Sequence, residues 1–193
     1  GTFMLADLAP GPTGSGPRNF CSIGSTLYFL ANDPTSGLDI WTSDGTAAGT
    51  RRITGLFPGA ASANPIDLVS VGDTLYFSAE LPATGRELWR SDGTPAGTAL
   101  LIDLIPGPVS SIPSGLTALG SRLVFHAEDA RFGRELWISD GSAETTTLLA
   151  DLLPGELGST PAQLYVHDDQ LFFHATDAGS SRSIYTTNGL PGG

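Results

Sequence analysis

Three aspartates share one sequence context that offers carboxylates for binding a cation. Asp44, Asp92 and Asp140 each stand between a serine and a glycine. Carboxylate oxygens are favoured ligands of calcium. The same Asp-Gly sequence also favours a tight turn, in which the carboxylate accepts a backbone N–H and the glycine adopts a positive φ angle. We favour the turn and keep a metal site as the alternative.

Two histidines are a second candidate for metal chemistry. His126 and His174 lie 48 residues apart, and Leu30 and Ser78 occupy the same position earlier in the chain. Imidazole nitrogens are common zinc ligands. Equivalent positions on neighbouring structural units are usually too far apart to share one ion. We therefore expect both histidines to be ordinary strand residues.

Motifs for catalysis are absent from the sequence. It contains no Gly-x-Ser-x-Gly elbow, no His-Glu-x-x-His pair and no glycine loop that would hold a phosphate. A glycosidase needs two carboxylates at a defined separation across a cleft. Neighbouring acids such as Glu128 and Asp129 do not supply that separation. We therefore predict no catalytic residues and no enzyme, and a glycan-acting hydrolase is the least favoured alternative.

The composition restricts the class of partner. The 193 residues carry a net charge of −11, and all nine basic residues are arginines. Such a surface repels nucleic acid and anionic membranes, because both need a basic footprint. No apolar run approaches the ~18 residues of a membrane span, so we predict no membrane insertion. Cys21 is the only cysteine, which excludes a disulfide within the chain.

A period of 48 residues runs through the chain four times without insertion or deletion. Trp41, Trp89 and Trp137 keep this spacing, and Tyr185 takes the fourth place. A period of this length is typical of a supersecondary unit that buries its apolar face against its neighbours. We predict one domain over residues 1–193. Its repeats are 1–48, 49–96, 97–144 and 145–193.

Each repeat predicts four short strands and no helix. In the third repeat the expected strands are 98–104, 116–119, 122–127 and 134–139, because these segments are rich in β-branched and large apolar residues. The Asp-Gly pair after the last of them favours a hairpin turn. Four antiparallel strands in about 48 residues form one blade of a β-propeller. The predicted fold is therefore all-β, a four-bladed β-propeller.

The two ends of the chain share one register. Residues 183–189 correspond to a fourth strand and its turn, and residues 1–8 correspond to the strand that follows such a turn. We predict that the N-terminal strand closes the last blade, so that a monomer forms a complete ring. A domain-swapped dimer that completes blades between chains would use the same register. Inner-strand carbonyl groups could hold calcium or another cation in the central channel, and no other cofactor is predicted.

The tryptophan segments carry a recognisable motif. Residues 85–94 (Gly-Arg-Glu-Leu-Trp-Arg-Ser-Asp-Gly-Thr) and 133–142 (Gly-Arg-Glu-Leu-Trp-Ile-Ser-Asp-Gly-Ser) resemble the ELWxxDGT repeat family of bacterial surface and secreted proteins. Residues 39–46 are a near match, and residues 183–189 are a degenerate one. The resemblance covers the whole chain. It implies a propeller-like module, secreted or on the bacterial cell surface, and it implies no catalytic residues.

The loops between the third and fourth strands differ most among the repeats, and such loops commonly carry binding. We place the candidate ligand site on the face of the propeller that these loops form. The third of these loops holds a pair suited to stacking and hydrogen bonding, Arg131 and Phe132. The candidate residues are Asn32, Asp33, Glu80, Glu128, Asp129, Arg131, Phe132 and Asp177.

These observations favour a non-catalytic extracellular module that recognises a glycan or a protein partner through its loop face. Several weak sites on one chain would gain by avidity, which makes the module lectin-like or adhesive. The alternative is a structural or spacer domain of a larger bacterial surface protein.

Overall fold

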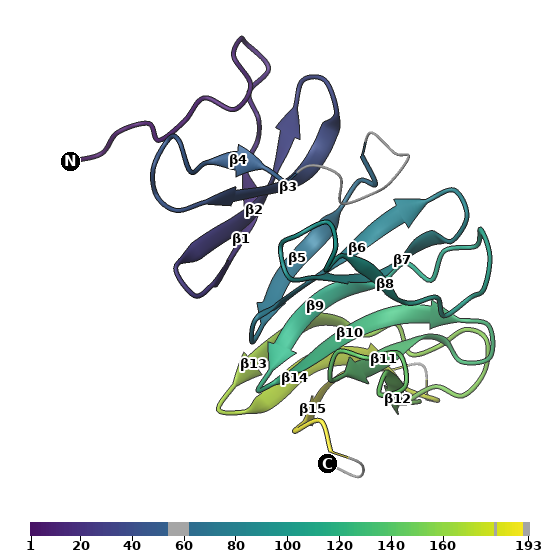
Figure 1. Cartoon of the computed structure of the whole chain (residues 1–193). Coiled ribbons are helices and arrows are strands. Elements are labelled where there is room, and N and C mark those ends of the chain that lie inside the picture. The colour runs from purple at the N-terminus through teal and green to yellow at the C-terminus, as the bar shows by residue number, and fades with distance from the viewer. Residues whose placement is uncertain (54–61, 180, 191–193) are drawn as a thin grey trace.

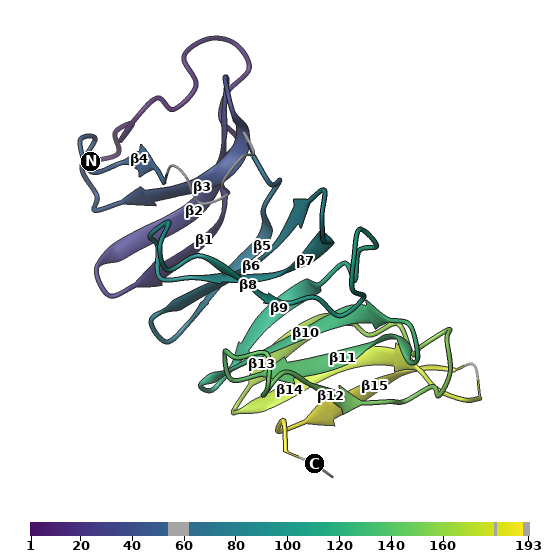
Figure 2. The ribbon, with the colours of Figure 1, turned by 45° about the vertical axis from the view of Figure 1, so that its right-hand side comes forward.

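The computed structural model consists of four antiparallel β-sheets stacked one on another (Figures 1 and 2). It describes residues 1–53, 62–179 and 181–190. Within these ranges the chain forms fifteen strands and no helix, and therefore no helix that could cross a membrane. The all-β prediction is confirmed, and the fold is β-propeller-like.

The first two sheets each contain four strands in chain order. The first sheet comprises β1 (Arg18–Ile23), β2 (Thr26–Asp33), β3 (Gly37–Ser43) and β4 (Arg51–Arg52). The second comprises β5 (Ile66–Val71), β6 (Thr74–Leu81), β7 (Gly85–Ser91) and β8 (Ala99–Ile102). The sequence also predicts a loop at residues 58–65, between the outer strand of one repeat and the next strand. This loop begins outside the described residues, which resume at residue 62.

The third sheet repeats this pattern, and the fourth sheet has one strand fewer. The third comprises β9 (Ser114–Leu119), β10 (Arg122–Asp129), β11 (Gly133–Ser139) and β12 (Thr147–Ala150). The fourth comprises β13 (Ala162–His167), β14 (Gln170–Thr176) and β15 (Arg182–Thr187). The four strands predicted for the third repeat are all present, as β8, β9, β10 and β11. The first of them, β8, belongs to the second sheet, so a repeat contributes its outer strand to the preceding sheet.

The apolar cores lie between consecutive sheets. Middle strands such as β6 and β10 are buried on both faces, so their sequences are nearly continuous apolar runs. First strands contact one another along one side of the stack, in the order β1, β5, β9, β13. This arrangement is the one expected near the axis of a propeller. The core between the first and second sheets contains Tyr28, Leu30, Ile40, Leu75, Phe77 and Trp89.

The predicted closure of the last blade by the N-terminal strand is wrong for this structure. Residues 1–7 belong to no strand, and among the described residues β15 pairs only with β14. Leu8 packs instead against Phe29 and Trp41 of the first sheet. The N-terminus therefore lies at the opposite end of the stack from β15 (Figure 1). Repeat register showed which strands are equivalent, but the curvature of the stack decides whether its two ends meet.

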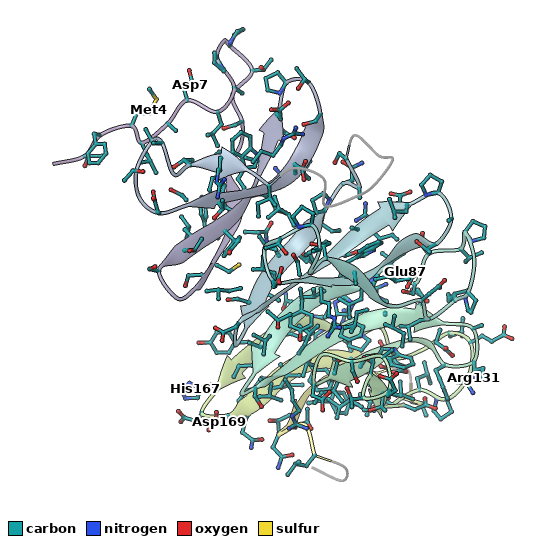
Figure 3. The ribbon with its side chains drawn as sticks, in the orientation of Figure 1. Met4, Asp7, Glu87, Arg131, His167 and Asp169 are labelled. Carbon is teal, nitrogen blue, oxygen red and sulfur yellow. The ribbon has the colours of Figure 1, made fainter. Side chains whose placement is uncertain are left out.

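A buried glutamate joins each of two sheets to the chain segment that leads into the next sheet. Glu87 in β7 accepts hydrogen bonds from the backbone N–H (2.7 Å) and the hydroxyl of Ser111. Glu135 in β11 accepts the same two bonds from Ser159, with the N–H at 2.6 Å. All four residues are fully buried, and Figure 3 shows Glu87 within the stack. We call this arrangement the glutamate clamp.

Removing one clamp should destabilise the protein. Replacing Glu135 with alanine leaves the N–H and hydroxyl of Ser159 buried without their acceptor. An unsatisfied buried polar group costs about 1–3 kcal/mol, so we expect Glu135→Ala to lower the free energy of unfolding by about 2–4 kcal/mol. Urea denaturation measures the change. Glu156→Ala, at an exposed position in the segment between β12 and β13, is the control, and equal stability of the two variants would contradict the role of the clamp.

Candidate functional site

The predicted ligand residues lie at equivalent places on one face of the stack. They stand where β2, β6, β10 and β14 end and turn into β3, β7, β11 and β15. Figure 3 shows Arg131 on this face, while His167 and Asp169 mark the hairpin tip on the opposite side. We call the surface formed by these four turns the loop face. The repeat therefore brings the predicted residues to one face, on four successive sheets.

Three of the predicted acidic residues are engaged in holding their own turns. Asp33 Oδ1 accepts the N–H groups of Thr35 (2.8 Å) and Ser36 (2.9 Å), and it also accepts the Thr35 hydroxyl. The hydroxyl bond and the two N–H bonds strongly lower the pKa of the Asp33 carboxyl. Asp129 Oδ1 accepts the N–H of Arg131 at 2.8 Å. Asp177 Oδ1 accepts the N–H of Gly179 at 2.9 Å. Each is an Asx turn, a structural role that the charge pattern alone did not separate from binding.

Two of the predicted glutamates form ion pairs with arginines of the neighbouring strand. Glu80 lies 3.2 Å from Arg86, and Glu128 lies 3.3 Å from Arg134. Arg86 also donates to the carbonyl of Asn64 at 3.0 Å. Each arginine side chain therefore spans its own sheet from the third strand to the segment before the first. Both glutamates are partly neutralised and partly exposed on the loop face.

The turn between β10 and β11 presents a cation stacked on an aromatic ring. The guanidinium carbon of Arg131 lies 4.9 Å from the centre of the Phe132 ring. The Arg131 side chain is 77% exposed, and its Nε lies 3.7 Å from Asp129. The equivalent residues of the second turn are Ala83 and Thr84. The loop face is therefore distinguished at this turn by an exposed donor group and an aromatic surface.

The two repeat-related histidines bind arginines rather than each other. His126 Nδ1 lies 2.7 Å from Arg134 Nη2, and His174 Nδ1 accepts a bond of 2.7 Å from Arg182 Nε. Gly115 faces the His126 ring so closely that a Cβ atom there would lie 2.7 Å from Nε2. Burial, with the charge of Arg134 as a second cause, lowers the pKa of His126 to about 4. Nδ1 therefore acts as an acceptor and the ring is neutral at pH 7.

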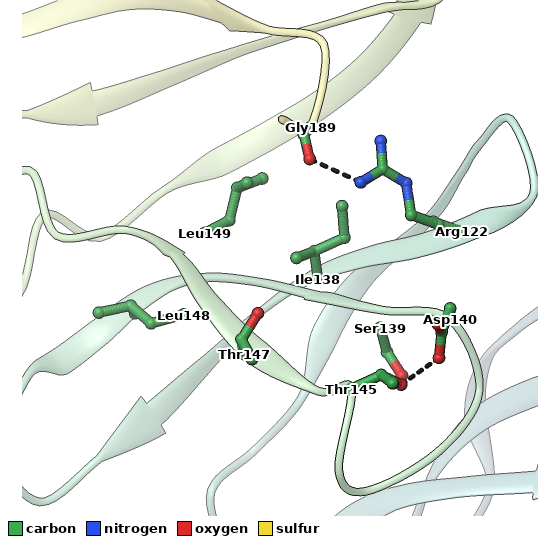
Figure 4. A pocket seen from close by; sticks show the side chains of 9 residues that line it. All are labelled: Arg122, Ile138, Ser139, Asp140, Thr145, Thr147, Leu148, Leu149 and Gly189. Carbon is green, nitrogen blue, oxygen red and sulfur yellow. Dashed lines mark hydrogen bonds between the residues drawn. The ribbon is translucent and has the colours of Figure 1, made fainter. Parts of the chain in front are cut away.

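The Ser-Asp-Gly turns lie on the side of the stack opposite the loop face, and their carboxylates are hydrogen-bonded locally. Asp44 and Asp92 each accept the N–H of the threonine two residues later, at 2.9 and 2.8 Å, and its hydroxyl. These bonds lower the pKa of both carboxyls. Asp140 accepts the hydroxyl of Thr145 (Figure 4). Within the described ranges, no three His, Cys, Asp or Glu residues cluster to suit a metal ion.

Two grooves open between sheets beside these turns. One, of about 290 Å³, lies between the third and fourth sheets (Figure 4), where Arg122 donates to the carbonyl of Gly189 at 2.7 Å. The other, of about 470 Å³, lies between the first and second sheets and contains Arg51 and Asp92. Sequence reasoning missed both grooves, because each is formed by residues from two repeats.

Comparisons with known proteins identify the fold and go no further. No protein-family model matches the chain, and no curated protein matches it. Among solved structures, a prolyl endopeptidase superposes with a TM-score of 0.58 and 18% identity over 85% of this chain and 23% of that one. The AtxE2 isopeptidase superposes with a TM-score of 0.53 and 12% identity, over 81% of this chain and 25% of that one. A puromycin hydrolase variant complexed with PGG superposes with a TM-score of 0.53 and 17% identity, over 89% of this chain and 26% of that one. The chain thus spans about a quarter of the length of these structural neighbours, and what it shares with them is the β-propeller-like stack.

The buried histidine should make stability fall in acid. Because the folded-state pKa of His126 is about 4 and an unfolded histidine has a pKa of about 6.5, the unfolded chain binds the extra proton between these values. Stability is therefore full above about pH 6.5 and declines as pH falls toward 4. His126→Leu, which copies Leu30 of the first repeat, should remove about 2–3 kcal/mol of this decline. Urea denaturation at pH 7 and pH 4 tests this, and parallel pH profiles would contradict it.

Proposed function

We propose that the chain is a non-catalytic binding module that recognises a glycan or a protein partner through its loop face. The observation that carries this proposal is the exposed Arg131 side chain stacked on the half-buried Phe132 ring at the third turn. A guanidinium stacked on an aromatic ring is held in place, so less side-chain entropy is lost when it binds. The pair offers hydrogen-bond donors beside an apolar surface, which suits the hydroxyl groups and C–H face of a sugar or the carbonyl groups and side chains of a peptide.

The engagement of the repeated motif residues supports the same proposal. Glu87 and Glu135 hold sheets together, and Asp44 and Asp92 hold turns. Residues that recur in the repeat are thus used by the scaffold, whereas a turn residue that varies, such as Arg131, is exposed and can contact a ligand. The loop-face carboxylates are committed to Asx turns or ion pairs, which favours binding over acid–base chemistry.

The setting that we propose follows from the resemblance and from the charge. We propose a secreted or bacterial cell-surface protein, because the Glu-Leu-Trp segments resemble repeats of such proteins. A net charge of −11 disfavours nucleic acid as a partner. We also propose that the sheets are blades of a propeller whose axis runs beside the first strands. A cation bound by carbonyl groups on that axis is the one cofactor to test.

The loop-face site can be tested by transferring a turn from one repeat to another. The double change Arg131→Ala with Phe132→Thr copies Ala83 and Thr84 of the second turn, so the fold should be retained. On a glycan array and a peptide array, we expect the parent chain to bind selected ligands and the double variant to lose about tenfold or more in affinity, as expected for two central contacts.

The matched control is Ala47→Ser, an exposed change beside a Ser-Asp-Gly turn and away from the loop face. It should bind as the parent does. Running each array with calcium and with a chelator tests the cation separately. Blank arrays for the parent, or equal binding by the parent and the double variant, would contradict the proposed site and favour a spacer role.

A further inference from the structure

The fourth sheet has an open edge. It contains three strands, whereas each of the other sheets contains four. The outer edge of β15 pairs with no strand in the part of the chain that the structure describes. At the same position, β7 pairs with β8 and β11 pairs with β12. An unpaired edge of this kind is a template for another strand.

The outward face of the same sheet carries apolar residues that remain exposed among the described parts of the chain. Ile184 repeats the position of Ile40, Leu88 and Leu136. Those three side chains are fully buried under the following sheet, whereas Ile184 is 81% exposed. Phe172, which repeats the position of the buried Tyr28, is exposed as well. This face therefore has the composition of an interface between sheets.

The N-terminal segment has the register of the missing strand. Residues 3–6 repeat the positions of β8, and Phe3 and Met4 are 79% and 78% exposed outside any strand. In the second sheet Ala99 lies opposite Arg90, and Leu100 lies opposite Trp89. Phe3 and Met4 lie two repeats before Ala99 and Leu100, whereas Thr186 and Tyr185 lie two repeats after Arg90 and Trp89. The same pairing would therefore place Phe3 opposite Thr186 and Met4 opposite Tyr185. A strand without a sheet and a sheet without its outer strand thus match in position.

The first sheet offers the other half of such an interface. Leu8 packs on its free face, as Leu104 and Leu152 pack on the sheets that follow them. Next to it lies an apolar hollow of about 160 Å³, lined by residues that include Leu5, Phe20 and Leu27. In the other interfaces, residues equivalent to Phe20 and Leu27 contact the preceding sheet. Residues 5–8 therefore already lie where the outer strand of a preceding sheet would be.

We infer that a second copy of this chain docks on the first sheet, with its β15 pairing with residues 3–6 and its Ile184 and Phe172 entering the hollow beside Leu27. The two faces are the complementary halves of an interface that occurs three times within the chain. They lie at opposite ends of the stack (Figures 1 and 2), so in this structure one molecule cannot join them. The contact is head-to-tail. Two chains would close a ring of eight sheets, a size that propellers adopt.

Cross-linking tests the pairing directly. Phe3→Cys and Thr186→Cys are made in separate chains, both residues being exposed. Mixing the two variants under mild oxidant should give a disulfide-linked pair of one chain of each kind. The parent chain is the control for Cys21. Burial raises the pKa of the Cys21 thiol to about 11, which makes this thiol poorly reactive. A chain carrying both cysteines that cross-links only to itself would overturn the proposal in favour of closure within one chain.

Sedimentation velocity at increasing protein concentration tests the contact without cross-links. The parent should form a dimer. Ile184→Asp removes an apolar side chain that the contact between chains would bury, and Met4→Pro removes a backbone N–H from the strand that would pair. Each variant should therefore weaken association by about tenfold or more. Val109→Asp, an exposed position in the loop between the second and third sheets, is the control and should leave association unchanged. A monomeric parent, or variants that associate as the parent does, would overturn the proposal.

A third variant should strengthen the contact. Ser183 stands at the position of Glu87 and Glu135, and Ser15 stands at the position of their partners Ser111 and Ser159. Ser183→Glu would build a glutamate clamp between the two chains. We expect association to tighten by about tenfold, as for hydrogen bonds to a charged group. Unchanged or weaker association would count against the docking geometry.

Discussion

Burial of every inner sheet on both faces is the constraint on which the rest of this structure depends. A strand such as β6 meets one neighbour through Phe77 and the other through Tyr76, so neither face can be polar. The sheets must then be fixed in angle and spacing, because apolar packing alone is not directional. The glutamate clamp supplies direction. It ties β7 to the segment before β9, and β11 to the segment before β13, through hydrogen bonds to a carboxylate at a fully buried position. Burial raises the pKa of both carboxyls, and the serine hydrogen bonds oppose that shift.

The first repeat shows what replaces the clamp when its residues change. Asp39 and Ala63 occupy the positions of Glu87 and Ser111, and Asp39 pairs with Arg52 at 3.4 Å instead. The hydroxyl of Ser62, one residue away, donates to the carbonyl of Leu38 across the same interface. Where the glutamate of the clamp is replaced, as by Asp39, the serine that would donate to it is replaced as well. This arrangement leaves the turns of the loop face outside the stabilising network of the core, so they can vary at little cost in stability.

The sequence predicted the strands well because a fixed period reports packing, and packing is the same in each repeat. Trp41, Trp89 and Trp137 occupy equivalent places in successive sheets as their spacing implied. Closure was not predictable in this way, since register carries no information on how far each sheet rotates from the last. The acidic residues of the loop face were only partly understood: Asp33 and Asp129 looked like ligand groups, but each accepts the backbone N–H of the residue two positions later. The clamp was missed because its two residues lie 24 positions apart, although their joint change in the first repeat was a visible signal.

A glutamate and a serine on adjacent segments act as one unit that fixes the second sheet to the third and the third to the fourth. Building the unit where it is missing tests this most directly, by measuring urea unfolding of Asp39→Glu, Ala63→Ser and the double variant. We expect the double variant to be more stable than the sum of the single changes by about 1–3 kcal/mol, the contribution of hydrogen bonds to a buried charged group. Single changes that simply add would contradict it.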